Sequence, residues 1–371
     1  MNRIASSARR LLSAMLAMLA ALLAVLAPGA AHAEPYLALD QGYKCVACHV
    51  NITGGGLRNG LGAFYTQNAM AAYKLPEGVP AWSGRLADWL RVGADVRYSA
   101  TRNRVPGQPE QSESALDHAR LYADVELLKD WIGLYLDQQV RPGRPERQEA
   151  HVRLGSADRG WYAKAGQFYL PFGWRLEDDS AFVRSVSGIS MTAPDKGLEL
   201  GLEKGDWSAQ LAYTRGPGNV GPTTGHQVTG QAVWTQPWGR VGVALASTSS
   251  SAGNRQAAAL FGGLRTGPVV WLGEIDLVRD KSFPEGRRTL AAALGEVNWK
   301  PAQGHNLKFT AELFDPDRRV SEDHKVRHSL VYELTPIPFL QLRAGYRRFG
   351  GIPQSPVDNR KLMFLELHAF M

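Results

Sequence analysis

Alternation of apolar and polar residues with a period of two constrains the fold of this chain more than any other feature. From Leu86 onward, apolar side chains alternate with charged or polar ones in segments of about ten residues. In one such segment, Leu340 and Leu342 alternate with Gln341 and Arg343. An apolar face opposite a charged face is typical of a transmembrane β-barrel with a wet lumen.

The spacing of these segments indicates how the strands are connected. Short connections such as Lys129-Asp130 and Pro237-Trp238 alternate with longer ones, which reach 27 residues between Tyr169 and Asp195. A soluble β-sandwich, the alternative, would need no such rhythm. Outer-membrane barrels place short turns in the periplasm and long loops outside, and an even number of strands leaves both termini periplasmic. The sixteen segments are 86–99, 117–128, 131–140, 150–157, 161–168, 196–204, 206–215, 225–236, 239–249, 254–265, 268–279, 288–299, 304–314, 323–334, 338–348 and 360–371. We therefore predict an all-β fold, a sixteen-stranded antiparallel transmembrane β-barrel over residues 86–371.

The first 33 residues have the pattern of an export signal. A basic start is followed by the apolar run Leu11 to Leu26, and Ala31-His32-Ala33 supplies small residues for cleavage. An uncleaved anchor helix is the alternative. Cleavage would start the mature chain at Glu34 and lower the formal net charge from +7 to +4, because residues 1–33 contain three arginines and no acid. The sequence contains no basic run with interleaved aromatic residues, so it does not indicate a nucleic-acid partner.

Both cysteines of the chain lie in Cys45-Val46-Ala47-Cys48-His49. Cys-x-x-Cys-His is the attachment sequence of c-type haem. The two thiols can reach the two vinyl groups of one porphyrin, and the histidine can coordinate the iron from the proximal side. A thioredoxin-type disulfide would need a βαβ context, and a zinc site would need a second Cys/His pair. The motif predicts one covalently bound haem c, attached to Cys45 and Cys48 with His49 as proximal ligand.

The sixth ligand of that iron stays open at this stage. Met70 is the only methionine between the motif and Trp89, and the alternative is a packing residue in an Ala-rich helical turn. His368 is the second candidate, because the alternation places it on the lumen side near the periplasmic end. Five-coordinate iron and a bound water are further alternatives. Residues 34–85 would bury little apolar surface alone, so we interpret them as a cytochrome c-like plug or cap of the barrel.

The order of signal peptide, one haem motif and barrel resembles the fused monohaem cytochrome–porins of the outer membrane. Ala33-Glu34-Pro35-Tyr36-Leu37-Ala38 is similar to the start of that family, and Gly42 precedes Cys45 by three residues as it does there. The resemblance implies an electron carrier in outer-membrane lipid. It would oxidise extracellular Fe(II) and pass electrons to a periplasmic cytochrome, which is an Fe(II):cytochrome c oxidoreductase activity.

A second resemblance is to phosphate-selective porins. The run from Gly166 to Gly173, followed by Phe182-Val183-Arg184, looks like the strand and inward loop of that barrel family. Two alternative functions stay open beside electron transfer by the chain's own haem. One is a solute or anion porin whose haem-bearing plug has a sensory or structural role, and the other is a barrel that holds a separate multihaem cytochrome. Mixed lumen charges, such as Arg343 and Glu366, predict a salt-bridged interior.

Overall fold

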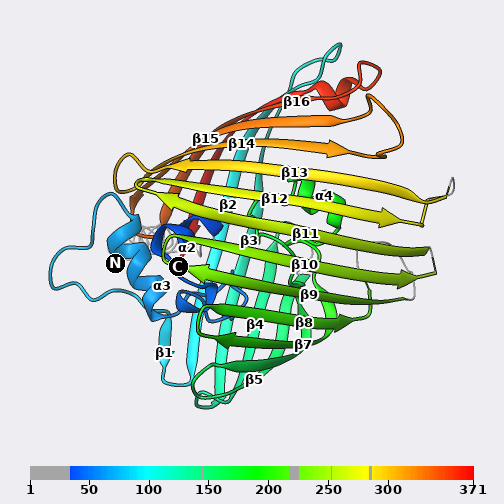
Figure 1. The fold of residues 1–371 in the computed structure, drawn as a ribbon. Coiled ribbons are helices and arrows are strands. Elements are labelled where there is room, and N and C mark those ends of the chain that lie inside the picture. The colour runs from blue at the N-terminus through cyan, green and yellow to red at the C-terminus, as the bar shows by residue number, and fades with distance from the viewer. Residues whose placement is uncertain (1–33, 144–145, 217–224, 252, 284–285) are drawn as a thin grey trace, which may run out of the picture.

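Sixteen antiparallel strands make up most of the structure, a computed structural model that describes residues 34–143, 146–216, 225–251, 253–283 and 286–371. The predicted signal peptide, residues 1–33, lies outside the described residues. The strands are β2 (Leu90–Arg104), β3 (Gln111–Leu128), β4 (Ile132–Arg141), β5 (Glu146–Gly155), β6 (Trp161–Phe168), β7 (Asp195–Lys204), β8 (Trp207–Thr214), β9 (Gly225–Gln236), β10 (Gly239–Ser250), β11 (Gly253–Thr266), β12 (Val269–Asp280), β13 (Arg288–Trp299), β14 (His305–Asp315), β15 (Lys325–Ile337), β16 (Leu340–Gly350) and β17 (Lys361–Phe370). Each pairs with its neighbours in sequence, and β17 pairs with β2 to close the barrel (Figure 1). The predicted fold class is confirmed.

The first two strands differ from their predicted bounds of 86–99 and 117–128. β1 (Arg85–Ala87) is a separate short strand that pairs with the start of β2. β2 continues to Arg104 and β3 begins at Gln111, and together they form a polar, mostly exposed hairpin. Because this hairpin extends beyond the apolar band, its sequence has no apolar alternation that could reveal it.

The outer face of the barrel is apolar, and the charged side chains point inward as the alternation predicted. On β17, Leu365 is 63% exposed, whereas His368 on the opposite face is only 1% exposed. A ring of exposed aromatic residues is typical of the boundary between membrane and water. Exposed tryptophans of this kind lie beside the short turns: Trp89, Trp131, Trp161, Trp207, Trp238, Trp271 and Trp299.

The long connection between β6 and β7 folds into the lumen. Its short helix α4 (Phe182–Ser187) packs against β12, β13 and β14. Trp174 and Val183 of this connection join Val233 and Leu272 of the barrel wall in one buried apolar cluster. On this side the lumen is therefore a packed core, which the predicted salt-bridged interior did not anticipate.

Ion pairs also occupy the lumen, where the predicted salt-bridged interior is found. Arg343 on β16 lies 3.1 Å from Glu366 on β17 and 3.0 Å from Glu177 of the inward connection. Glu177 also pairs with Arg97 on β2. These pairs join the inward connection to the barrel wall, because buried charges are costly unless partners compensate them.

The N-terminal segment closes the end of the barrel that carries the short turns. Figure 1 shows α2 and α3 at this end, where the chain also terminates. Among the described residues, no helix is long and apolar enough to span a bilayer. The helical elements of the segment are α2 (Pro35–Gln41), the 3₁₀ turn η1 (Cys45–Ala47), α3 (Gly60–Tyr65) and the π turn η2 (Thr66–Met70).

Hydrogen bonds and apolar contacts fix this segment inside the barrel. The Tyr36 hydroxyl donates to Glu333 over 2.9 Å, and the Asn51 amide donates to Glu149 over 2.9 Å. Tyr36 and Leu39 also belong to the apolar cluster that contains Trp174. The segment is thus packed against both the barrel wall and the inward connection.

Candidate cofactor site

The Cys-x-x-Cys-His motif forms one tight turn at the inner surface of the N-terminal segment. The backbone N–H groups of Cys48 and His49 both donate to the carbonyl of Cys45, over 3.2 and 3.1 Å. Asn59 holds the turn from the other side, since its backbone N–H donates to the Cys48 carbonyl and its side chain donates to Ala47. These bonds fix the short stretch of backbone that carries both thiols and the imidazole.

Two glycines allow the chain to close over this turn. A Cβ on Gly62 would lie 2.1 Å from the carbonyl oxygen of Cys48. Gly54 has φ +89, a left-handed conformation, and a Cβ there would lie 3.0 Å from the Cβ of Cys45. A side chain at either position would displace the motif, because it would meet backbone or the base of a short side chain.

Cys45, Cys48 and His49 all line one cavity of about 920 Å³, a volume that includes its opening to solvent. Its apolar walls come from three parts of the molecule, namely the N-terminal segment, the inward connection and the barrel wall. Trp174 and Phe261 contribute aromatic surface and make an edge-to-face contact with ring centroids 5.2 Å apart. A largely apolar cavity with a few convergent polar groups is typical of a cofactor site.

The His49 imidazole is held in its neutral form. Burial, together with the nearby cations Arg58 and Arg175, lowers the pKa of His49 to about 3, and the facing backbone of Gly55 and Gly56 opposes this only in part. The side chain is 4% exposed, and its Nδ1 has no hydrogen-bond partner among the described residues. A neutral imidazole is the form that coordinates a metal ion.

Four cationic side chains also line the cavity. Lys44 and Arg175 have acidic partners, at 3.1 Å in Glu203 and 3.5 Å in Glu149 respectively. The other two are Arg58 and Arg240, both of which are buried. In the described part of the chain, no carboxylate lies within ion-pairing distance of either guanidinium. An anionic ligand would offset the cost of these two buried charges.

Arg240 is positioned directly beside the motif. Its Nη1 lies 3.9 Å from the sulfur of Cys45, and its Nη2 donates to the carbonyl of Tyr43 over 2.6 Å. Its guanidinium also lies 5.8 Å from the centre of the Trp174 ring. No sequence pattern indicated Arg240, Trp174 or Arg175, although the resemblance to an inward loop indicated the segment that carries the last two.

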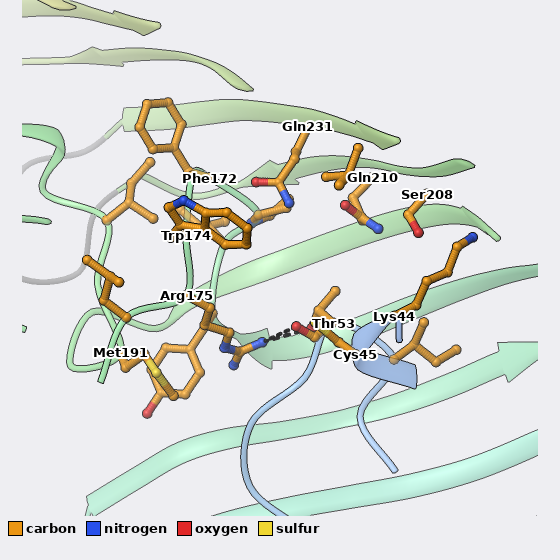
Figure 2. A pocket seen from close by; sticks show the side chains of 18 of the residues that line it. Lys44, Cys45, Thr53, Phe172, Trp174, Arg175, Met191, Ser208, Gln210 and Gln231 are labelled. Carbon is orange, nitrogen blue, oxygen red and sulfur yellow. Dashed lines mark hydrogen bonds between the residues drawn. The ribbon is translucent and has the colours of Figure 1, made fainter. Parts of the chain in front are cut away.

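A second cavity of about 720 Å³ adjoins the first and shares Cys45, Trp174 and Arg175 with it. Figure 2 shows how Arg175 of the inward connection reaches Thr53 of the N-terminal segment. Its Nη1 donates to the Thr53 hydroxyl over 3.0 Å and to the Thr53 carbonyl over 3.2 Å. In the same view, Met191 lies well away from Cys45, with Arg175 between them. The inward connection is therefore tied to the chain that carries the motif.

The two candidate sixth ligands lie elsewhere. Met70 packs against a separate apolar cluster that includes Leu57 and Phe370. The His368 ring lies 4.9 Å from the ring of Phe370, and its Nε2 is 3.4 Å from Asp95. The alternation correctly placed His368 on the lumen side, but neither His368 nor Met70 is among the described residues that line the cavity. Across the same residues, no three His, Cys, Asp or Glu side chains converge on a protein-only metal site.

Comparison with known proteins relates the chain to porins by fold. No protein-family profile matches it, and no curated protein matches it in sequence. The anion-selective porin from Comamonas acidovorans aligns with a TM-score of 0.62 at 10% identity, over 76% of this chain and 99% of the porin. The chain has the fold of an outer-membrane porin. Pseudomonas putida OprB aligns with a TM-score of 0.60 at 10% identity, over 76% of this chain and 94% of OprB. The channel DcaP of Acinetobacter baumannii gives 0.59 at 10% identity, over 76% and 97% of the two chains.

Proposed function

We propose that this protein is exported, sits in the outer membrane, and carries one covalently bound haem c in the cavity beside its Cys-x-x-Cys-His motif. Cys45 and Cys48 would hold the porphyrin through thioether bonds, and His49 would coordinate the iron. The observation that carries the proposal is that both thiols and a neutral imidazole line one cavity of about 920 Å³, part of which is open to solvent. Haem supplies one-electron redox chemistry when it is bound.

The position of the cavity supports electron transfer across the membrane as the activity. The apolar band of an outer-membrane barrel, about 25 Å tall, blocks electrons and charged donors alike. The cavity lies at the barrel end that carries the short turns, which is the periplasmic end in such barrels. We infer that a soluble periplasmic cytochrome is the acceptor and that the donor is extracellular. Fe(II) is the donor that the family resemblance implies.

The packing inside the lumen supports electron transfer as the function, in preference to an open channel. Tyr36 of the N-terminal segment, Trp174 of the inward connection and Leu272 of the wall belong to one continuous buried cluster. Such a core leaves little room for a steady flow of solute. The porin fold of the neighbours nevertheless favours a second candidate function. This is a solute or anion porin whose haem-bearing plug has a sensory or structural role.

Spectroscopy of the purified protein tests the haem and its donor separately. We expect a c-type spectrum that survives denaturation and acid extraction, since thioether bonds are covalent. Replacement of both Cys45 and Cys48 by Ser should abolish it. Stopped-flow mixing with Fe(II) should then produce the reduced α-band. A colourless wild-type protein would reject the whole proposal, whereas reduction by dithionite but not by Fe(II) would reject the donor alone.

Planar-bilayer recording distinguishes the two candidate functions. The electron carrier should show little steady ion current, because the N-terminal segment and the inward connection fill the lumen. A large, steady current through the wild-type protein with its haem attached would favour the porin.

A further inference from the structure

The chain contains few methionine and histidine residues that could coordinate the second face of a haem iron. Residues 34–371 contain four methionines and eight histidines, and the structure describes all of them. Of these twelve residues, only His49 lines the cavity that contains the two cysteines. The others are Met70, Met191, Met363, Met371, His118, His151, His226, His305, His324, His328 and His368.

Met191 comes nearest, because it lines the adjoining cavity. Its Cε lies 3.3 Å from the point that a Cβ on Gly55 would occupy. The backbone of Gly55 also faces the His49 imidazole, so Met191 packs beside the chain next to the proximal ligand and not in the cavity itself. A sixth ligand must approach the iron from the opposite face.

The remaining polar residues of the cavity are poor substitutes for such a ligand. Lys44 is bound to Glu203 and also donates to the carbonyl of Trp207 over 2.6 Å. Burial raises the pKa of Tyr65, so its phenol stays protonated, and Tyr43 is largely exposed. The protein therefore provides a proximal ligand without a strong distal one.

Charge decides which exogenous ligand fits. Arg58 and Arg240 are buried in the cavity without a carboxylate partner among the described residues. Haem has its vinyl and propionate groups on opposite edges of the porphyrin. A thioether bond to Cys45 would place the vinyl edge at this sulfur, 3.9 Å from Arg240, and would leave the charge of Arg240 for a ligand other than a propionate.

We propose that the cavity leaves the sixth coordination position of the iron open and that this position binds a small inorganic anion, of the class of azide, cyanide or hydrosulfide. The inference rests on the haem attachment proposed above. Arg240 is the residue that would attract the anion, since a guanidinium in a low-dielectric site strongly favours negative charge.

The test uses the full-length, haem-loaded ferric protein in detergent and two probes, azide and the neutral ligand imidazole. We expect a high-spin ferric spectrum without the near-infrared band of a methionine–iron bond, and a saturable Soret shift with azide. Arg240→Gln should weaken azide binding about tenfold through loss of one nearby charge and leave imidazole binding unchanged. Arg265→Gln is the matched control, because Arg265 lies at the same end, donates to the Asp40 carbonyl over 2.7 Å and is absent from the cavity lining.

Three further variants identify an internal ligand if one exists. Met70→Leu, Met191→Leu and His368→Gln should each leave the ferric spectrum unchanged. A low-spin wild-type spectrum that one of these variants converts to high-spin would overturn the inference and name the true ligand. Equal losses of azide and imidazole binding in Arg240→Gln would overturn the role of its charge. Absence of covalent haem would reject the proposed function itself, and this inference with it.

Discussion

The carboxylate of Glu34 lies 2.8 Å from the ammonium group of Lys308 on β14. Glu34 is the first residue after the predicted signal peptide, and it is only 6% exposed. Lys308 also lies 3.0 Å from Glu333, and Arg343 lies 3.5 Å from Glu34 and 3.3 Å from Glu333, so two buried cations compensate two carboxylates. This arrangement joins Glu34, the predicted start of the mature chain, to the barrel wall.

Replacing Lys308 should loosen the N-terminal segment. Lys308→Met leaves Arg343 as the remaining cation beside the buried carboxylates of Glu34 and Glu333, so it should cost less than the about 3–5 kcal/mol of a fully broken buried pair. Limited proteolysis in detergent should then cut the chain between η2 and β1 at lower protease concentrations. Lys325→Met is the control, because it removes a partly exposed pair with Asp358 next to a long loop. Identical digestion of both variants would contradict the anchoring role of Lys308.

The inward connection depends on Glu274 of β12. This carboxylate accepts hydrogen bonds from the backbone N–H of Trp174, over 2.9 Å, and from Arg184. We expect Glu274→Ala to release the connection, since it leaves a buried arginine without compensation at a cost of about 3–5 kcal/mol. Single-channel conductance should rise and become noisier. Glu322→Ala, at an exposed loop position, should leave the conductance unchanged.

Gly173 offers an independent route to the same outcome. Its φ is +62, and a Cβ there would lie 1.9 Å from Oε1 of Glu274. Gly173→Ala should therefore open the lumen as Glu274→Ala does, because the side chain cannot share that space. A Gly173→Ala protein with unchanged conductance would show that this contact does not hold the connection.

Local sequence patterns predicted the barrel well because each strand has an apolar face toward lipid. The alternation placed Leu365 outside and His368 inside without any knowledge of the partner strands. The Cys-x-x-Cys-His motif was equally visible, since its five residues are contiguous, and the haem that it predicts stays a prediction. The predicted barrel agrees with the observed strand order, with its closure by β17 and β2, and with the tryptophans beside the short turns.

Contacts between distant segments could not be predicted in the same way. Arg240 reaches the sulfur of Cys45 across 195 positions of sequence, and nothing local to either residue indicates the other. Arg58 of the N-terminal segment likewise lies 4.8 Å from the centre of the Phe370 ring, a contact that depends on how this segment and the barrel end pack. The sequence therefore identified the motif but not the walls of its cavity.

Acid should weaken the fixation of the inward connection through Asp178. Burial alone would raise the pKa of Asp178, but Arg347 and Arg327, each 2.9 Å away, hold it well below its ordinary value of 3.8. A depressed carboxyl pKa contributes stability that is present above the unfolded pKa and is lost as pH falls toward the folded pKa. Conductance should therefore stay constant from neutral pH to about pH 4 and rise only below it.

Two variants assign this acid response to Asp178. Asp178→Asn should already have the raised conductance at neutral pH and should lose the additional rise in acid. Asp158→Asn, in an exposed turn at the other end of the barrel, should keep the wild-type profile. A pH profile of Asp178→Asn that matches the wild type would assign the acid response to other groups.

The lipid-facing side of β17 provides a test of the membrane assignment. Leu365 is directed outward in the strand that closes the barrel, where it lies opposite Ala344 of β16 and Ala100 of β2. Leu365→Arg should destabilise the folded barrel by about 2–4 kcal/mol, the cost of an arginine near the bilayer midplane. Urea unfolding in lipid vesicles measures this, with loss of heat-modifiable migration as the readout. Val357→Arg, at an exposed apolar position in the loop between β16 and β17, should cost far less because that residue lies outside the lipid band. Equal destabilisation by both variants would mean that Leu365 does not face lipid.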